Sequence, residues 1–273
     1  MRLLPSTIIF PHCSPQVLDA SNIDYYADDR FNTMIKTIKP FAPPVFTGNH
    51  RKLCKDSSRL KQKFHYCLPI SGTKDSDFCS KADRLDLLLP QTRSTRCHAS
   101  VLHMLLVDVY EELQAHEYSP ILTYGSLLGA VRNGSIIPFT EDTDIAYSGE
   151  ITSDSALAEA LWKKGYHLFT NRIWRVCVAP THPLAGNLFD PDRPAKNFAM
   201  PYVDLYSMNK TEDEAAYTMQ ELRRRTLPTD SVEPFSKVMI NGLPFNTVHD
   251  PEFFLLAEYG ADFRSPKPRN RGK

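Results

Sequence analysis

Residues 120–148 constrain the fold of this chain most strongly, because they read PILTYGSLLGAVRNGSIIPFTEDTDIAYS. The β-rich run PILTYG, which ends in glycine, predicts a strand. SLLGAVR predicts a short helix, and DTDIAYS predicts a second strand. A strand, a helix and another strand in one short run predict a sheet with helices packed beside it.

Two longer helices flank this unit in the sequence. In residues 95–118 apolar side chains recur at helical spacing, which predicts an amphipathic helix of about five turns. Its apolar positions are Val101, Leu102, Leu105, Leu106, Val109 and Leu113. Farther on, SDSALAEALWKKGYH predicts a helix capped by Ser153 or Asp154.

The second half of the chain is rich in strand signals. YHLFT and IWRVCVAP predict a hairpin, and YVDLYSM predicts another strand. KVMINGLPFNTV predicts a hairpin that turns at Asn241 and Gly242. The closing HDPEFFLLAEYG predicts a helix with Asp250 as N-cap, Pro251 in its first turn and Gly260 at its end. Mixed strands and helices of this kind indicate an α+β fold.

The chain divides into three regions by composition. Residues 1–94 contain clustered prolines, cysteines and polar runs with weak periodicity, which predicts an irregular N-terminal region. Residues 95–266 carry the helix and strand signals and form the main domain. Residues 267–273 form a basic tail.

Charge and hydropathy exclude several classes of partner. Thirty-two basic residues balance thirty-two acidic ones, so we expect no nucleic-acid partner, which would call for a basic excess. No window is long and apolar enough to predict a transmembrane segment. The first residues, MRLLPSTIIFPHC, are too short and too interrupted by proline for a signal peptide. The chain is therefore either cytoplasmic, or a leader or anchor is missing from this version of it.

The six cysteines show none of the C-x-x-C pairs that are typical of zinc sites. They can be buried thiols. Alternatively, Cys54, Cys67, Cys79 and Cys97, which lie in polar and loop-like sequence, form disulfides in an oxidising compartment.

An anion-binding turn is the first candidate feature of a functional site. A strand that ends at Gly125 and Ser126 and runs into a helix directs backbone N–H groups at whatever lies above the helix start, and phosphate suits such a place. Arg132, six residues later, can pair with the same anion. The simpler interpretation of Gly125 and Ser126 is an ordinary turn.

Three aspartates form the second candidate feature. Asp142 and Asp144 are two residues apart on a predicted strand and therefore share one face. Asp204 lies inside the apolar strand YVDLYSM, where an isolated carboxylate is costly to bury. A shared Mg²⁺ or Mn²⁺ would neutralise all three, since these ions prefer oxygen ligands. The alternatives are a solvated acidic strand end for the first two, and a salt bridge to Arg223, Arg224 or Arg225 for Asp204.

These motifs resemble the LicD family, which includes fukutin and the fukutin-related protein. YGSLLGAVRNGSIIPFTEDTDIAY is similar to the family pattern G-[ST]-L-L-G-x-x-R followed by I-P-W-D-D-D-I-D. The strand VDLY and the ending INGLPFNTVHDPEFFLLAEYGADFRSP also resemble the family, whose members end in a Y-G-x-x-[WF]-x-x-P run. The resemblance covers roughly residues 95–266.

The resemblance implies a nucleotidyltransferase-like fold, a small mixed sheet flanked by helices. It implies an Mg²⁺-dependent phosphotransferase that moves phosphocholine or an alditol phosphate from a CDP-linked donor to a hydroxyl of a glycan or glycoprotein. Gly125, Ser126 and Arg132 match the substrate-binding positions. Asp142, Asp144 and Asp204 match the catalytic, metal-binding carboxylates. Eukaryotic relatives work in the Golgi or endoplasmic reticulum lumen, which implies the secretory pathway.

The run PFTEDTD departs from the family pattern. Phe139 replaces tryptophan, Thr140 and Glu141 replace the first two acids, and Thr143 replaces isoleucine. The eroded acidic run motivates an alternative, a catalytically impaired relative that binds a glycan or a partner enzyme. A third possibility is a nucleotidyltransferase that acts on small molecules or proteins through the same metal site.

Overall fold

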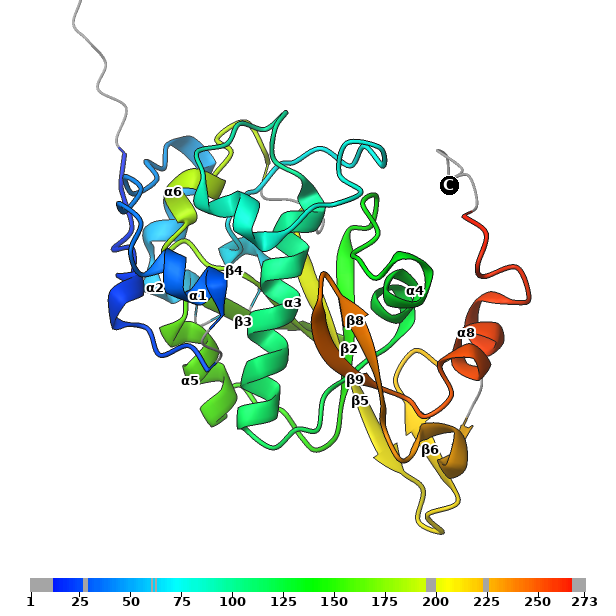
Figure 1. Cartoon of the computed structure of the whole chain (residues 1–273). Coiled ribbons are helices and arrows are strands. Elements are labelled where there is room, and N and C mark those ends of the chain that lie inside the picture. Colours follow the sequence, from blue (N-terminus) through cyan, green and yellow to red (C-terminus); the bar gives the residue numbers. More distant parts are fainter. Residues whose placement is uncertain are drawn as a thin grey trace, which may run out of the picture.

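A mixed β-sheet with helices packed beside it organises the chain (Figure 1). The structure is a computed structural model that describes residues 12–266 apart from 27–28, 60, 62, 195–199 and 223–225. Its nine-stranded sheet has the order β3-β4-β5-β2-β1-β9-β8, and β6 and β7 extend it beside β5. Strands β2 and β5 are parallel, as are β1 and β9, and the remaining pairs are antiparallel. The predicted α+β class is confirmed.

The strands follow the predicted order along the chain. Their bounds are β1 Ile121–Leu122, β2 Asp142–Tyr147, β3 Tyr166–Asn171, β4 Ile173–Val178, β5 Tyr202–Lys210, β6 Ala216–Met219, β7 Leu227–Pro228, β8 Ser236–Ile240 and β9 Leu243–Thr247. The two predicted hairpins are β3–β4 and β8–β9. Strands β6 and β7 were not predicted from the sequence.

The α-helices cluster around the sheet and in the N-terminal region. Their bounds are α1 Arg30–Ile35, α2 Asp56–Arg59, α3 His98–Ala115, α4 Tyr124–Asn133, α5 Ala156–Lys163, α6 Ala185–Leu188, α7 Thr229–Val232 and α8 Pro251–Tyr259. Four short 3-10 helices, η1 Ala20–Asn22, η2 Gly48–Cys54, η3 Phe64–Tyr66 and η4 Arg84–Leu88, lie before α3. No helix among the residues just described is long and apolar enough to cross a lipid bilayer.

Helix α3 is the central helix of the fold, and it is the helix predicted from residue 95. It packs against β2, β4 and β5 of the sheet and against α5 (Figure 1). Its apolar positions Val101, Leu105 and Val109 are fully buried. His98 and His103 are buried as well, because the N-terminal region covers the side of α3 that the sheet leaves open.

Local signals placed the helix ends and turns to within a few residues. Asn241 and Gly242 both have positive φ angles, 48° and 81°, as the predicted hairpin turn requires. Asp250 caps α8 by accepting a hydrogen bond from the Phe253 N–H. Helix α5 is capped by Ser155 rather than by Ser153 or Asp154, because the Ser155 hydroxyl accepts the Ala158 N–H.

The N-terminal region shares one hydrophobic core with the rest of the chain. Phe31, Phe46 and Leu53 belong to the same buried cluster as α3 and the sheet. In its described residues this region contains only short helices and isolated bridges, as expected of an irregular segment. The predicted division at residue 94 thus does not interrupt the core, and as a boundary between units it stays a prediction.

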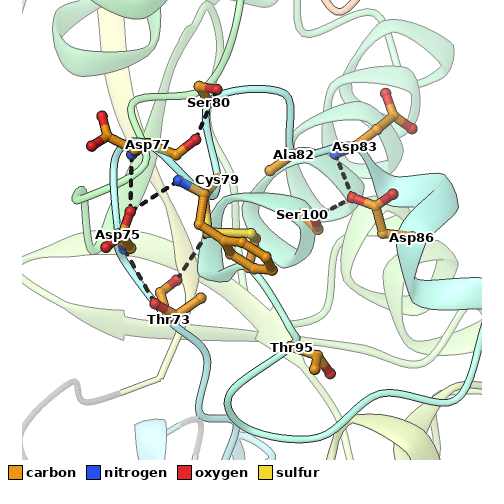
Figure 2. The surroundings of a disulfide bond; sticks show 12 residues. Thr73, Asp75, Asp77, Cys79, Ser80, Ala82, Asp83, Asp86, Thr95 and Ser100 are labelled. Carbon is orange, nitrogen blue, oxygen red and sulfur yellow. Dashed lines mark hydrogen bonds between the residues drawn. A yellow bond between two sulfur atoms is a disulfide. The ribbon is translucent and has the colours of Figure 1, made fainter.

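Three disulfides fasten the N-terminal region, and they join all six cysteines. They are Cys13–Cys54, Cys67–Cys177 and Cys79–Cys97. Of the two interpretations left open, disulfides rather than free buried thiols is the correct one. Cys79 and Cys97 pair with each other, whereas Cys54 and Cys67 pair with Cys13 and Cys177, which that interpretation did not include. Cys67–Cys177 links the N-terminal region to β4, and Cys79–Cys97 holds a loop against the start of α3 (Figure 2).

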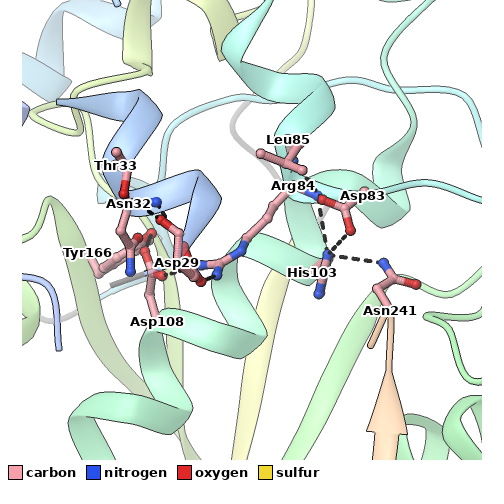
Figure 3. A network of polar contacts seen from close by, with 10 residues as sticks. All are labelled: Asp29, Asn32, Thr33, Asp83, Arg84, Leu85, His103, Asp108, Tyr166 and Asn241. Atoms are coloured by element: carbon pink, nitrogen blue, oxygen red, sulfur yellow. Dashed lines mark hydrogen bonds and ion pairs between the residues drawn. The ribbon is translucent and has the colours of Figure 1, made fainter. Parts of the chain in front are cut away.

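A buried ionic network also joins the N-terminal region to α3 (Figure 3). The Arg84 guanidinium lies between the carboxylates of Asp29 and Asp108, and its Nη1 is 3.4 Å from Asp108 Oδ1. Tyr166 of β3 donates its hydroxyl proton to Asp108 as well. Arg84 and Asp108 are almost completely buried, and an unpaired charge at such a depth would destabilise the fold. Each of the two side chains therefore compensates the charge of the other.

We expect the Cys67–Cys177 disulfide to stabilise the fold more than Cys79–Cys97 does. The first closes a loop of 110 residues and the second one of 18, so chain entropy predicts contributions of about 5 and about 3 kcal/mol. The measurement is urea unfolding of the variants Cys67→Ala/Cys177→Ala and Cys79→Ala/Cys97→Ala. Equal losses in the two double variants would contradict this ranking.

We also expect Glu111→Gln to stabilise the protein above pH 7. Burial and the negative charge of Asp108 raise the pKa of Glu111 to about 7, and its Oε2 has no hydrogen-bond partner among the described residues. The ordinary pKa of glutamate is 4.5. Between pH 4.5 and pH 7 the Glu111 carboxyl therefore keeps its proton in the folded protein but has lost it in the unfolded chain, so stability falls as pH rises through this range. Glutamine cannot acquire the charge.

The gain in the free energy of unfolding for Glu111→Gln should be on the order of 1 kcal/mol at pH 8, since Glu111 is partly exposed. Thermal or urea unfolding between pH 4 and 8 measures it. The gain should shrink toward zero at pH 4, where glutamate is protonated in both states. A gain that did not depend on pH would exclude ionisation of Glu111 as its cause.

Candidate active site

The parallel pairing of β2 with β5 brings the three predicted aspartates together. Asp144 lies opposite Asp204 in the register of the two strands, and Asp142 lies opposite Tyr202. The Tyr206 hydroxyl is 3.1 Å from Asp144 Oδ1 and 3.1 Å from Asp204 Oδ2, so both carboxylates point to the same side of the sheet. Asp142, two residues before Asp144, shares that face.

The first turn of α4 holds the Asp144 carboxylate. Asp144 Oδ2 accepts hydrogen bonds from the N–H groups of Gly125 at 2.8 Å and Ser126 at 3.3 Å. In return, the Ser126 hydroxyl accepts the Asp144 N–H at 2.7 Å. The positive end of the helix therefore receives a carboxylate of the protein itself.

Helix α4 begins earlier than predicted, and this changes the role of Gly125. The helix starts at Tyr124, so Gly125 and Ser126 belong to its first turn instead of ending the preceding strand. A Cβ atom at Gly125 would lie 2.9 Å from Asp144 Oδ2, closer than side-chain carbons approach. Glycine is needed here for the approach of Asp144, and the binding of a phosphate by Gly125 and Ser126 stays a prediction.

Tyr124 shows that the backbone is strained at this point. Its φ angle is +42°, a left-handed conformation that is unfavourable for a residue with a bulky side chain. The tyrosine hydroxyl donates to the Gln220 carbonyl at 2.9 Å, and its ring centre lies 4.7 Å from that of Tyr206. These contacts fix an unfavourable conformation directly beside the carboxylates.

Asp204 is paired with an arginine that was not predicted. Arg175 of β4 lies opposite Asp204 in the sheet, and its Nε is 2.6 Å from Asp204 Oδ1. Both side chains are largely buried, with 15% and 8% of their surfaces exposed. The alternative partners Arg223, Arg224 and Arg225 lie outside the described residues.

The charges at this site raise the pKa values of two aspartates. Burial, together with the negative charges of Asp142 and Asp204, raises the pKa of Asp144 well above its ordinary value. Burial also raises the pKa of Asp204 to about 6, although the positive charge of Arg175 opposes the shift. The cluster is therefore short of positive charge, which favours the binding of a cation.

An acidic cavity of about 370 Å³ opens onto the carboxylates. It lies between β2, the start of α4 and the end of α8. Its lining side chains are tyrosines, carboxylates and small residues, namely Tyr124, Gly125, Thr140, Asp142, Asp144, Tyr206, Glu221, Glu258 and Tyr259. Asp142 and Asp144 thus face a space that a ligand can enter, whereas Asp204 does not line the cavity.

The donor atoms suit a hard divalent cation, but they are not all free to bind one. Among the residues that the structure describes, no three histidine, cysteine, aspartate or glutamate side chains are already arranged around one metal position. Asp204 Oδ1 faces Arg175, and Asp144 Oδ2 faces α4. Asp142 and Asp144 nevertheless offer oxygen ligands on one face above the cavity, and Mg²⁺ commonly uses one or two carboxylates together with substrate phosphates.

Arg132 lies away from the carboxylates. Its Nε donates to the Phe263 carbonyl at 2.6 Å, and its Nη2 is 3.3 Å from the Ser265 carbonyl. It lines a separate cavity of about 180 Å³ with Gly129 and Phe139. The structure therefore uses Arg132 to hold the segment after α8, and its contact with a diphosphate stays a prediction.

The residues that depart from the family pattern have partners of their own. Thr140 donates its hydroxyl proton to Asp142 Oδ1 at 3.1 Å. Glu141 pairs with Lys74 of the N-terminal region at 2.5 Å, and its carbonyl lies 3.4 Å from His98 Nε2. Thr140 thus orients Asp142, while Glu141 fastens the loop before β2.

Sequence reasoning missed Arg175, Tyr206 and Tyr124. Tyr206 lies two residues after Asp204 on the same strand, so the alternation of side chains could have placed it on the face of the carboxylates. No local signal pointed to Arg175, because its contact with Asp204 depends on the pairing of β4 with β5. The positive φ angle of Tyr124 likewise had no local signal in its own residue type.

Comparison with known proteins identifies a domain that contains the site. Residues 118–247 match the family model described as the LicD/FKTN/FKRP nucleotidyltransferase domain. The matched range includes β1 through β9, α4 and all three aspartates. The chain is also 32% identical over 94 residues to an uncharacterized protein of Rickettsia typhi, an alignment that spans 34% of this chain and 30% of that protein.

We expect Arg175→Met to lower the free energy of unfolding by about 3 kcal/mol, because it leaves the Asp204 carboxylate buried without its cation. In an Asp204→Asn background the same substitution should cost at most about 1 kcal/mol, since no charge is left unpaired. Urea unfolding of the four proteins of this cycle measures the difference.

Arg172→Met is the matched control for that cycle. Arg172 lies between β3 and β4, and its ion pair with Glu221 is mostly exposed, so the loss should stay within about 0.5 kcal/mol. If Arg175→Met cost the same in both backgrounds, the energetic coupling to Asp204 would be refuted.

Proposed function

Because the chain belongs to the LicD/FKTN/FKRP family through its nucleotidyltransferase domain, we propose that it is a metal-dependent phosphotransferase. In this proposal it moves a phosphorylated group, phosphocholine or an alditol phosphate, from a CDP-linked donor to a hydroxyl of a glycan or glycoprotein. Members of this family are generally transferases. The identity of the transferred group, of its donor and of its acceptor is what we propose for this chain.

The observation that carries the proposal is the convergence of Asp142, Asp144 and Asp204 on one face of the sheet beside an open cavity. Group transfer between phosphates and hydroxyls needs little covalent chemistry from the protein. It depends on positioning and on compensation of negative charge. A cluster that is itself short of positive charge is suited to bind the cation that this chemistry uses.

The residues divide the work in the proposed mechanism. Asp142 and Asp144 hold Mg²⁺ or Mn²⁺, with Asp204 as the third carboxylate of the set. Such an ion, when bound, compensates the charge of the donor phosphates. The α4 N-terminus keeps Asp144 in place, Thr140 orients Asp142, and Arg175 holds Asp204. One of the carboxylates accepts the proton of the attacking hydroxyl.

The contacts to the donor are a less direct part of the proposal. Gly125, Ser126 and Arg132 were predicted to bind its diphosphate, and in the structure all three have partners within the protein. We therefore propose that the positive end of α4 holds the Asp144 carboxylate in place rather than the donor. Contact of the donor with Nε or Nη2 of Arg132 would require release of the carbonyl groups of Phe263 and Ser265.

We place the protein in the secretory pathway, in the lumen of the Golgi or endoplasmic reticulum. The three disulfides support this location, because such bonds persist in oxidising compartments and are rare in the cytosol. Glycan acceptors are also consistent with it. A cytoplasmic location remains the alternative, and subcellular fractionation with a thiol-labelling assay would distinguish them.

A second candidate function is that of an accessory protein without catalysis. It is favoured by one observation: Asp204 is already paired with Arg175, so the three carboxylates are not arranged as ready metal ligands. Calorimetry with Mg²⁺ and CDP separates the two functions. A transferase should bind the nucleotide in a metal-dependent way, whereas an accessory protein should not.

We expect Asp142→Asn to reduce Mg²⁺-dependent release of CMP from CDP-choline, CDP-glycerol or CDP-ribitol by at least about 100-fold. Asp142 is preferred to Asp144 for this test, because its loss leaves the contact between Asp144 and α4 intact. Asp77→Asn, an exposed aspartate in the N-terminal region, is the matched control and should retain full activity. Undiminished turnover in Asp142→Asn would refute the proposed role.

A further inference from the structure

A second hollow of the molecule lies far from the carboxylates, around Trp162 at the end of α5. Two cavities of about 530 and about 560 Å³ adjoin there, and both are lined by Trp162 and Lys163. We call them together the Trp162 groove. The first cavity continues over Arg59, Ser153, Asp154, Ser155, Ala158, Glu159, Tyr166, His167 and Leu168. The second continues over Pro15, Gln16, Val17, Leu18, Asp19, Asn22, Ile23, Leu53, Cys54, Tyr66 and Thr181.

The centre of the Trp162 groove is aromatic and firmly supported. The Arg59 guanidinium lies 3.9 Å from the centre of the Trp162 ring. The Tyr66 ring lies 5.9 Å from the Trp162 ring, and it packs in turn on His167 at 5.1 Å. Tyr66 and His167 are almost completely buried, so the partly exposed Trp162, which lines both cavities, rests on a fixed base.

The margins of the groove are polar and nearly balanced in charge. Asp154 and Glu159 border the first cavity, and Gln16, Asp19 and Asn22 border the second, all of them exposed. The basic side chains of the groove are Arg59 and Lys163, and Lys163 pairs with Glu159 at 2.9 Å. A groove with little excess charge is a poor site for nucleic acid or for a polyanion.

We propose that the Trp162 groove binds a neutral oligosaccharide. A sugar ring has an apolar C–H face and a rim of hydroxyl groups. The C–H face can lie on an indole ring, while carboxylate and amide groups at the margins, and the Arg59 guanidinium beside the indole, exchange hydrogen bonds with the hydroxyls. Each cavity is large enough for a small-molecule ligand, and their junction at Trp162 gives the elongated shape that suits a chain of sugars.

The position of the groove separates it from the carboxylate cavity. The groove borders β3, the edge strand of the sheet, whereas Asp142 and Asp144 lie on β2. Strands β4 and β5 stand between them, a distance of about 14 Å between the axes of β3 and β2. Figure 1 shows α5 and β3 on one side of the molecule and α4 and α8 on the other. If the proposed transferase function holds, the bound chain is a part of the glycan acceptor that lies remote from the attacking hydroxyl.

Tryptophan fluorescence can report on the groove directly, because the chain contains two tryptophans, Trp162 and Trp174. Replacement of Trp174 by phenylalanine leaves Trp162 as the single reporter. Linear hexasaccharides of glucose, xylose and N-acetylglucosamine, together with an array of neutral glycans, are the probes. We expect at least one of them to change the Trp162 emission in a saturable way, and no saturable change with any probe would overturn the proposal.

Variants then assign the binding to the groove. Trp162→Ala should weaken binding on the array by at least about 10-fold, and Asp154→Ala and Asn22→Ala should each weaken it measurably. The last two are surface changes, so they keep the test valid if Trp162→Ala does not fold. Phe78→Ala, which removes a 62% exposed aromatic outside the groove, is the matched control and should bind as the unaltered protein does. Unchanged binding in Trp162→Ala, Asp154→Ala and Asn22→Ala would place the glycan elsewhere.

The outcome is independent of catalysis. Asp142→Asn should lose metal-dependent turnover and still bind the oligosaccharide with unchanged affinity. If turnover is found and no glycan binds, the groove proposal fails alone. If a glycan binds at Trp162 and no donor is turned over, the transferase proposal fails alone.

Discussion

The compensation of one buried carboxylate, that of Asp144, determines the architecture around the candidate active site. Only 6% of this residue is exposed, and an ionised carboxylate at such a depth is stable only with several hydrogen-bond donors or a cation. Two backbone N–H groups of α4 and the Tyr206 hydroxyl supply the donors. The start of α4 must therefore lie against β2, and residue 125 must lack a side chain.

The same requirement extends to the neighbouring strand. Because β2 and β5 are parallel and in register, Asp204 shares the Tyr206 hydroxyl with Asp144, and that hydroxyl has one proton to donate. Arg175 on the next strand compensates part of the charge of Asp204. The site is thus built from three adjacent strands and the start of one helix. Each of these elements contributes a polar group whose burial would be unfavourable without the others.

The sequence was informative wherever a signal is local. The spacing of apolar residues located α3, the Asn241–Gly242 pair located a hairpin turn, and the two-residue spacing of Asp142 and Asp144 placed them on one face. It was uninformative where strand pairing decides. Arg175 and Asp204 are far apart in the chain, and nothing in either segment indicates that β4 lies beside β5. The sequence predicts a phosphate at the α4 N-terminus; in the structure the Asp144 carboxylate lies there, and phosphate binding stays a prediction.

The N-terminal region explains why weak periodicity is compatible with a fixed structure. Its segments are held by disulfides and by buried cations instead of long amphipathic faces. Arg96, just beyond this region, is an example: its guanidinium donates to the backbone carbonyls of Ser71 at 2.7 Å and Leu188 at 3.0 Å, and so joins an N-terminal loop to the end of α6. Contacts of this kind leave no periodic trace in the sequence.

Lys74 of the N-terminal region pairs with Glu141, and this ion pair explains the altered acidic run. The side chain at position 141 is turned toward the N-terminal region. The change at this position therefore leaves Asp142 and Asp144 on the face that borders the cavity.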